Sequence, residues 1–267
     1  MSVFGNTVRA TFRATFRALA LGAGLLLGAG AAPALAAGEA TAIPDHRFSF
    51  EGLFGTYDRA SAQRGFQVYK EVCAACHAMK QLSYRNLREL GLSDAEVRAI
   101  AATVEVQDGP NDEGQMFERP ARPSDRFRSP FPNENAARAA NNGAYPPDLS
   151  VIAKAREGGA DYLHALLTGY SDPPPGVTLM DGMNYNRYFP GHQIAMAQPL
   201  NEGQVTFHDG TNATVEQMAH DVATFLAWAA EPEMEERKRM GVRLIMFLTI
   251  LGGLAYAVKR RIWQDVH

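Results

Sequence analysis

Two stretches of the chain place apolar residues at the spacing of a helix that faces a core. Residues 58–72 form the first, and its apolar side chains recur on one side: Phe66, Tyr69 and Val72. A second helix is predicted over 215–230, because Thr214 followed three residues later by Gln217 is typical of a capping box. Its apolar residues fall on one face: Val215, Met218, Ala219, Val222, Phe225, Leu226 and Ala229.

The first of these helices carries a glycine that indicates a close helix crossing. Gly65 lies eight residues before Cys73, and Tyr69 lies four residues before it. Because glycine has no side chain, another helix can approach its backbone closely. We expect the helix over 215–230 to be that partner.

The N-terminal apolar run has the pattern of a secretory signal. Residues 1–36 contain Arg9, Arg13 and Arg17 but no acidic residue, and a Leu/Ala/Gly run follows up to a small-residue Ala-Leu-Ala site. A charged region, an apolar region and a small-residue site are typical of a cleaved signal peptide. The sequence therefore predicts a signal over 1–36, with an uncleaved N-terminal anchor as the alternative.

A second apolar run lies near the C-terminus. Leu244–Val258 contains 15 residues without a charge, and the cations Lys259, Arg260 and Arg261 follow directly. Such a length and flank favour one transmembrane helix over a buried core helix. We expect an anchor over 240–260, a main domain over 37–239 outside the cytoplasmic membrane, and a cytoplasmic tail over 261–267.

Composition narrows the class of the main domain. The chain has 24 Gly and 15 Pro, most of them between 107 and 199, which predicts long irregular segments. The net charge is −3, and loss of residues 1–36 would make it −6. An acidic chain is not expected to bind nucleic acid, and its 2 cysteines exclude a disulfide scaffold.

Both cysteines belong to one pentapeptide, Cys73-Ala74-Ala75-Cys76-His77. The pattern C-x-x-C-H is typical of covalent attachment of haem c, where two thiols meet the vinyl groups and the imidazole binds iron. A thioredoxin-like dithiol would need a βαβ context, and a zinc site would need a second ligand pair. Neither is found, so the motif predicts one haem c attached through Cys73 and Cys76, with His77 as an iron ligand.

The sixth iron ligand is less obvious from spacing alone. Five other histidines of the main domain have no distinguishing context: His46, His164, His192, His208 and His220. His192 is the best candidate among them because it lies close to a predicted loop. The methionines Met180, Met183 and Met196 also lie in predicted loops. Met196 is favoured, because its apolar stretch is bounded by two prolines, and axial methionine raises the reduction potential.

Several longer motifs make the chain similar to the cytochrome c1 family of the ubiquinol–cytochrome c oxidoreductase, or cytochrome bc1 complex, in its bacterial form. The resemblance runs from about residue 49 to the C-terminus. It is carried by GFQVYKEVCAACHAM (65–79), YRNL (84–87), VEVQDGPN (104–111), AARAANNGAYPPDLS (136–150), AREGGADYLHALLTGY (155–170), YFPGHQIAMAQPL (188–200), DVATFLAWAAEPE (221–233) and RKRMG (237–241).

The resemblance implies a mainly α fold: a class I cytochrome c-like haem domain with long irregular insertions and one C-terminal transmembrane helix. It places Met196 on the iron and Arg156 at a haem propionate. It also implies that four residues line the haem pocket, Asn141, Ala144, Pro146 and Pro147, and that four pack against the ring, Tyr162, Leu166, Phe189 and Ile194.

The resemblance also implies electron transfer without independent catalytic activity. Haem c would accept an electron from the Rieske iron–sulfur protein and pass it to a soluble c-type cytochrome, in a complex with cytochrome b. We expect the chain in the bacterial inner membrane, with membrane lipid around its anchor and the haem domain in the periplasm. The alternatives are a membrane-anchored haem c gas sensor and a stand-alone monohaem carrier.

Overall fold

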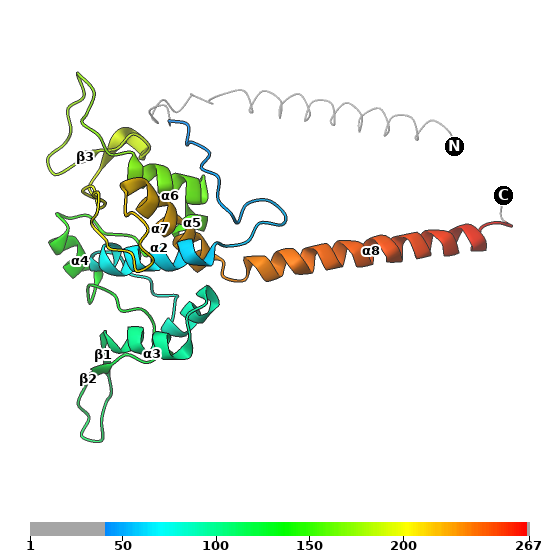
Figure 1. The fold of residues 1–267 in the computed structure, drawn as a ribbon, viewed down its shortest axis with the longest axis horizontal. Helices are drawn as coiled ribbons and strands as arrows, with labels where there is room; N and C mark the ends of the chain where they lie inside the picture. Colours follow the sequence, from blue (N-terminus) through cyan, green and yellow to red (C-terminus); the bar gives the residue numbers. More distant parts are fainter. Residues whose placement is uncertain (1–40, 266–267) are drawn as a thin grey trace, which may run out of the picture. The chain divides into compact units, whose positions relative to one another are not determined.

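The computed structural model describes residues 41–265, which are mainly helical, as predicted (Figure 1). The signal peptide predicted over 1–36 lies outside the described residues. The helices and 3-10 helices, in chain order, are α2 (Arg59–Glu71), η1 (Cys73–Ala75), η2 (Tyr84–Leu90), α3 (Asp94–Ala102), α4 (Glu134–Ala140), α5 (Ile152–Ala155), α6 (Gly159–Thr168), η3 (Pro190–His192), α7 (Val215–Ala230) and α8 (Met234–Ile262).

Helices α2 and α7 pack against each other in the centre of the domain, as the sequence predicts. Asp58 caps α2, because its side chain accepts hydrogen bonds from the backbone N–H groups of Ala60 and Ser61. A Cβ atom added to Gly65 would lie 1.9 Å from the backbone oxygen of Asp221 in α7. The predicted close crossing at Gly65 is therefore confirmed.

Helix α7 is buried on more sides than its apolar stripe predicts. Phe225 and Trp228 are fully buried, and so are Ala223 and Thr224, which lie outside the predicted face. The reason is tertiary packing, since α7 is contacted by α5 and α6 as well as by α2. At its start, Thr214 Oγ1 accepts a hydrogen bond from the backbone N–H of Gln217 at 3.1 Å, as expected.

The crossing also buries an ion pair. Asp221 is completely buried and accepts hydrogen bonds from Arg64 Nε at 2.7 Å and from Ser61 Oγ at 2.7 Å. Arg64 donates a further bond to the exposed carboxylate of Asp209 at 2.9 Å. These hydrogen bonds offset the loss of hydration that burial imposes on a charged group.

The Gly/Pro-rich region contains only short elements, as its composition predicts. Strand β1 (Glu105–Asp108) pairs antiparallel with β2 (Phe117–Pro120), with Glu105 opposite Pro120. Strand β3 (Asn184–Tyr185) pairs antiparallel with β4 (Gln193–Ile194). Between these elements the chain follows loops around the helices (Figure 1).

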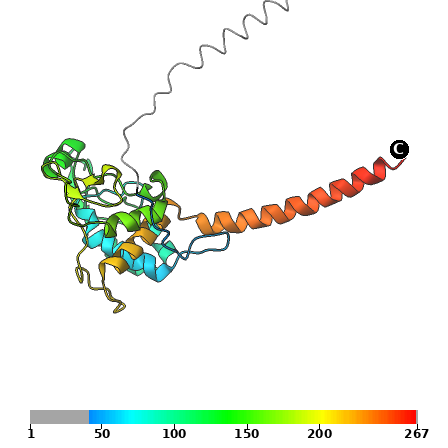
Figure 2. The same cartoon turned by 90° about the horizontal axis from the view of Figure 1, so that it is seen from above.

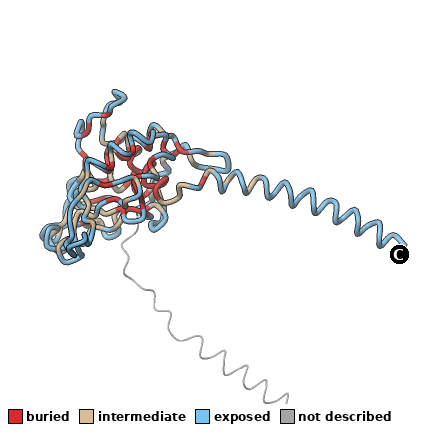
Figure 3. Tube along the Cα trace, turned by 90° about the horizontal axis from the view of Figure 1, so that it is seen from below, coloured by how far each residue is buried: buried red, intermediate tan, exposed pale blue. Residues whose placement is uncertain are grey.

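Helix α8 is one continuous helix (Figure 2) and is the one candidate membrane span within residues 41–265. Its residues from 243 onward are exposed (Figure 3). The first turns of α8 contact the rest of the domain. Met234 is buried, and the carboxylate of Glu235 accepts a hydrogen bond from Tyr57 N at 2.9 Å. Lys238 Nζ donates hydrogen bonds to the carbonyls of Phe50 and Gly55. The predicted boundary at 239/240 therefore falls inside a helix.

Candidate functional site

The predicted haem-attachment motif forms a tight turn directly after α2. The backbone N–H groups of Cys76 and His77 both donate to the carbonyl of Cys73, at 3.1 and 2.9 Å. Both thiols are free, with Cys73 partly buried and Cys76 exposed. Burial raises the pKa of the Cys73 thiol to about 12.

The His77 ring is oriented by a backbone carbonyl. Its Nδ1 lies 2.8 Å from the carbonyl oxygen of Pro147, so Nδ1 carries the proton and donates it there. Nε2 then keeps its lone pair. Burial lowers the pKa of His77, which favours the neutral ring. A neutral imidazole fixed through its other nitrogen is the usual form of a metal-ligating histidine.

The segment that contains Pro147 is bound along the motif. Leu149 N donates to the carbonyl of Ala78 at 2.8 Å, and Lys80 N donates to the Asp148 carboxylate at 2.9 Å. Gln81 N donates to Ser150 Oγ at 3.0 Å. The structure therefore brings the predicted haem segment around Pro146 and Pro147 against the attachment motif.

Asn141 and Ala144 lie just before this segment, in the turn that follows α4. Ala144 N donates to the carbonyl of Asn141 at 2.9 Å, and Asn141 Nδ2 donates to the carbonyl of Ala137 at 2.7 Å. These bonds fix the turn, and both residues are half-buried. Their predicted contact with haem stays a prediction.

The loop with Met196 is held from two other segments. Tyr170 Oη donates to the carbonyl of Met196 at 3.1 Å, and Asn184 Nδ2 donates to the same oxygen at 3.4 Å. Met196 and Met183 are half-buried, whereas Met180 is 62% exposed. The lower exposure of Met196 favours it over Met180 as a ligand to a buried group.

Asn186 is a central residue of this region that the sequence did not single out. It is completely buried, and its Nδ2 donates to the carbonyl of Leu166 in α6 at 2.7 Å. Its Oδ1 accepts from the backbone N–H groups of Tyr188 and Phe189 at 3.0 and 3.1 Å. Asn186 therefore joins two predicted haem contacts, Leu166 and Phe189, while Ile194 is buried in β4 nearby in the chain.

Arg156 directly follows α5, and Tyr162 lies in the first turn of α6. Tyr162 is buried, and burial raises its pKa, an effect that the charge of Arg156 opposes. The Arg156 side chain is exposed, and its Nη1 donates to the carbonyl of Ala155 at 3.2 Å. The Arg156 charge thus has no acidic partner in the described part of the chain, and its place at a propionate stays a prediction.

The predicted residues fall into two hydrogen-bonded groups, one around His77 and Pro147 and one around Met196 and Asn186. Within residues 41–265, no hydrogen bond joins the two groups directly. The first group comes from residues 77 and 147 and the second from residues 166–196, and their shared contact with haem stays a prediction.

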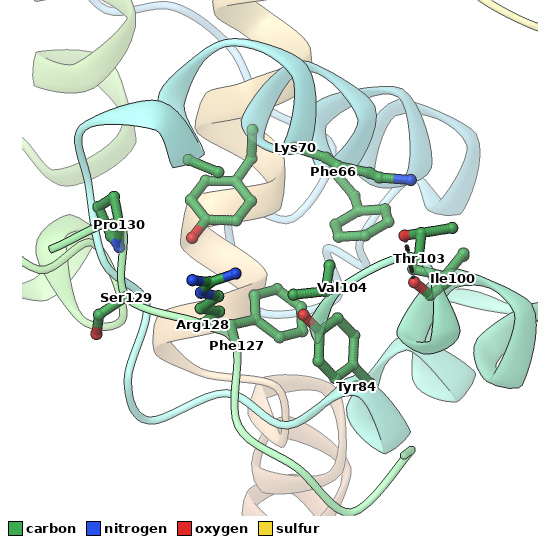
Figure 4. Close-up of a pocket in the computed structure, with 12 residues that line it drawn as sticks. Phe66, Lys70, Tyr84, Ile100, Thr103, Val104, Phe127, Arg128, Ser129 and Pro130 are labelled. Carbon is green, nitrogen blue, oxygen red and sulfur yellow. Dashed lines mark hydrogen bonds between the residues drawn. The ribbon is translucent and has the colours of Figure 1, made fainter. Parts of the chain in front are cut away.

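A pocket of about 480 Å³ lies beside the motif but is not the predicted haem site (Figure 4). Aromatic side chains dominate its wall, with Lys70 and Arg128 also lining it. Ala74 of the pentapeptide borders it, and none of the predicted haem contacts does. Its aromatic residues are Phe66, Tyr69, Tyr84 and Phe127.

Comparisons with known proteins identify the family to which the chain is similar. Residues 48–266 match the model of the Cytochrome C1 family. The chain is 53% identical over 221 residues to "Cytochrome c1-2, heme protein, mitochondrial" of Solanum tuberosum, which covers 83% of this chain and 85% of that protein. It is 45% identical over 260 residues to cytochrome c1 of Rhodospirillum rubrum, with 91% and 95% covered.

A relative of a different length is "Cytochrome b/c1" of Bradyrhizobium diazoefficiens, which is 51% identical over 246 residues. The match covers 84% of this chain and 36% of that protein, so the chain spans about a third of its length. Because the family model covers most of the chain, and relatives of similar length match at about half of their positions, the chain belongs to the cytochrome c1 family.

Proposed function

We propose that the chain is the haem c subunit of a bacterial ubiquinol–cytochrome c oxidoreductase. In this proposal it takes one electron from the Rieske iron–sulfur protein and gives it to a soluble c-type cytochrome. The observation that carries the proposal is the His77 ring, whose Nδ1 is tied to Pro147 while two free cysteines lie on the same turn. The names of the relatives, which include a heme protein and a cytochrome b/c1, support it.

The donor set fits haem c. Cys73 and Cys76 would form the thioether bonds, and His77 Nε2 and the Met196 sulfur would be the axial ligands. When bound, haem c supplies a one-electron iron couple, and axial methionine raises its potential. The chain's own residues fix the ligands: Pro147 orients the His77 ring, and Tyr170 holds the backbone at Met196.

The remaining predicted residues would enclose the ring and exclude water. Buried Tyr162 and Ile194 and half-buried Leu166 and Phe189 supply apolar contact area, and Asn186 fixes the backbone that carries two of them. A water-poor, rigid surrounding limits the reorganisation that accompanies a change of charge. The protein thus positions the cofactor and tunes its potential, and it needs no catalytic acid, base or nucleophile.

Helix α8 supports membrane attachment beside cytochrome b. Its exposed apolar residues match the length of a bilayer core, and cations follow in its last turn. With a cleaved signal, the haem domain would lie in the periplasm and the C-terminus in the cytoplasm. Purification through this chain should bring down cytochrome b, whereas purification of this chain alone would favour a stand-alone carrier.

Substitution of Met196 by Leu tests the site. Leucine removes the sulfur at similar volume, so the packing cost should stay below about 1.5 kcal/mol. The potential should fall by a large part of the ~0.8 V that axial ligands span. The reduced variant should also bind carbon monoxide, whereas the unaltered protein should not.

The matched control is Met183→Leu, because Met183 is also half-buried and lies in a loop. Its redox titration and carbon monoxide difference spectrum should equal those of the unaltered protein. A high potential retained in Met196→Leu, together with no carbon monoxide binding, would contradict the ligand assignment. Carbon monoxide binding by the unaltered protein would instead favour a gas sensor.

A further inference from the structure

Three histidines and a glutamate meet at a place that the haem site does not use. His46 precedes α2, His164 lies in α6, and Glu216 and His220 lie in the first turns of α7. The His46 and His164 rings are stacked, with centroids 3.6 Å apart. None of these residues has a distinguishing context in the sequence, so only the fold reveals the cluster.

Two ring nitrogens and one carboxylate oxygen of the cluster converge. His164 Nε2 lies 3.0 Å from Glu216 Oε1, and His46 Nδ1 lies 3.8 Å from the same oxygen. All three atoms lie within 4.8 Å of one another. Tetrahedral Zn²⁺ with ligand bonds of about 2.0–2.2 Å places its ligand atoms roughly 3.3 Å apart. The measured separations bracket that value.

His164 gives a second, independent indication. The residue is only 6% exposed, and its Nε2 is buried without a hydrogen-bond partner, despite the nearby Glu216 oxygen. A buried polar atom without a hydrogen bond is costly. A cation between Nε2 and Oε1 would satisfy both atoms.

His220 fixes the form of the His46 ring. His46 Nε2 lies 2.9 Å from His220 Nδ1. In the tautomer that carries its proton on His46 Nε2, this nitrogen donates to His220 Nδ1, and His46 Nδ1 keeps its lone pair toward Glu216. The backbone N–H of His46 also donates to the Asp161 carboxylate at 3.0 Å. A ligating histidine held through its other nitrogen is the usual arrangement around a protein-bound metal.

We propose that this cluster binds one divalent transition-metal ion of the Zn²⁺ class through His46 Nδ1, His164 Nε2 and Glu216 Oε1, with His220 as a positioning residue. Imidazole nitrogens select such ions over Mg²⁺ and Ca²⁺, which prefer oxygen ligands. The stacked His46 and His164 rings must rotate apart so that the lone pairs of both ligating nitrogens face the ion. The Glu216 side chain is 63% exposed, so the ion can reach the site from solvent.

The ion would fasten the segment before α2 to α6 and α7. This role differs from electron transfer and does not depend on the haem assignment. It predicts that Zn²⁺ slows amide hydrogen exchange in residues 42–48, because their contact with the helices would no longer open freely. The haem spectrum should not change.

The test uses the full-length protein in detergent. The protein is haem-loaded, so that thioether bonds occupy the cysteine sulfurs, and it has no polyhistidine tag, because a tag would itself bind Zn²⁺. Zn²⁺ titration by calorimetry should give one saturable site, and Co²⁺ should give the visible absorption of a low-symmetry nitrogen and oxygen site. His46→Ala and Glu216→Gln should each weaken Zn²⁺ binding at least 10-fold. His220→Gln should weaken it by about 10–100-fold, the range for residues that orient a ligand.

The matched control is His208→Ala, which removes an exposed histidine outside the cluster and should leave the affinity unchanged. Zn²⁺ should slow exchange at 42–48 in this control but not in His46→Ala. Absence of saturable Zn²⁺ binding would overturn the proposal. Equal affinity in His46→Ala and the unaltered protein would overturn it as well, since the ion would then lie elsewhere.

Discussion

Gly65 sets the distance between the two central helices because it has no side chain. A Cβ atom there would lie 1.9 Å from the Asp221 carbonyl oxygen and 2.8 Å from Phe225 Cβ. Both neighbours are fixed, since one is helix backbone and the other is a buried residue. Gly65→Ala should therefore reduce the free energy of unfolding by about 3 kcal/mol or more, at the upper end for overpacking.

Denaturant titration of the haem-loaded protein, followed by helical circular dichroism, measures this effect. The control is Gly241→Ala, because a Cβ atom at Gly241 in α8 would meet nothing within 4 Å. Alanine is the better helix former, so the control should be neutral or more stable by up to about 1 kcal/mol. Equal stability of the two variants would show that α2 and α7 are not in close contact at Gly65.

Single residues differ in how well the sequence reveals them. The pentapeptide 73–77 and the crossing at Gly65 could be predicted, because each depends on neighbours at fixed spacing in the chain. Asn186 could not, because its partners in α6 and in the 188–189 backbone are determined by the fold. The same holds for His46, His164 and Glu216, which meet from three separate segments.

At the scale of elements, the contact between α2 and α7 depends on the buried carboxylate of Asp221. Asp221→Ala would leave the Arg64 guanidinium without its buried partner and Ser61 Oγ without its acceptor. Breaking a buried ion pair typically costs about 3–5 kcal/mol. We expect a loss of that size in the free energy of unfolding, measured by denaturant titration.

The matched control for Asp221→Ala is Glu134→Ala in α4, which breaks an exposed pair with Arg138 at 2.7 Å. Exposed pairs contribute about 0–1 kcal/mol, so this variant should be almost as stable as the unaltered protein. A loss below 1 kcal/mol in Asp221→Ala would mean that Arg64 finds sufficient compensation from Asp209 and water.

The start of α8 belongs to the haem domain as well as to the anchor. A chain that ends at Glu233 loses the buried Met234 side chain, the hydrogen bond that Glu235 accepts and the hydrogen bonds that Lys238 donates. A chain that ends at Met240 keeps all of these contacts. Both should be soluble haem proteins with unchanged spectra, because the proposed ligands lie earlier. The shorter chain should be less stable by at least about 2 kcal/mol, from one buried Met and its neighbouring hydrogen bonds.

Thermal unfolding followed by haem absorbance compares the two truncated chains. Equal melting temperatures would show that the contacts of residues 234–238 add nothing to the domain. Loss of methionine ligation in the chain that ends at Met240 would contradict the division into a haem domain and an anchor.

Elements with long periodic patterns could be predicted, and short ones could not. The sequence predicts α2, α7 and the apolar part of α8, because each spans several turns. It does not predict α4 or α5, or the strands β1 to β4, which are too short for a period to emerge. It also misses the burial of α7 on several sides, since α5 and α6 come from the irregular region.

At the scale of the molecule, the proposed haem site is assembled from segments spread over more than 120 residues. The motif at 73–77 identifies the cofactor class by itself. The sequence favours Met196 because two prolines bound its apolar stretch, whereas Phe189 and Ile194 could be assigned only through the resemblance to the cytochrome c1 family, because loop residues have no period that indicates their position. Asn186 and Tyr170 hold this loop through hydrogen bonds, and its contact with haem stays a prediction.

The charge of the whole domain predicts how an electron acceptor would find it. Without residues 1–36 the chain is at −6, and residues 37–239 alone, with 19 basic and 28 acidic residues, are at −9, so a basic soluble c-type cytochrome should be attracted over a distance of about one Debye length. Electron transfer to that cytochrome, followed by stopped-flow absorbance under second-order conditions, should slow as ionic strength rises through ~0.15 M, where the Debye length is about 8 Å. An acidic or neutral c-type cytochrome is the control, since its rate should stay level or rise with salt. If the basic partner reacts equally fast at low and high salt, charge does not steer the encounter.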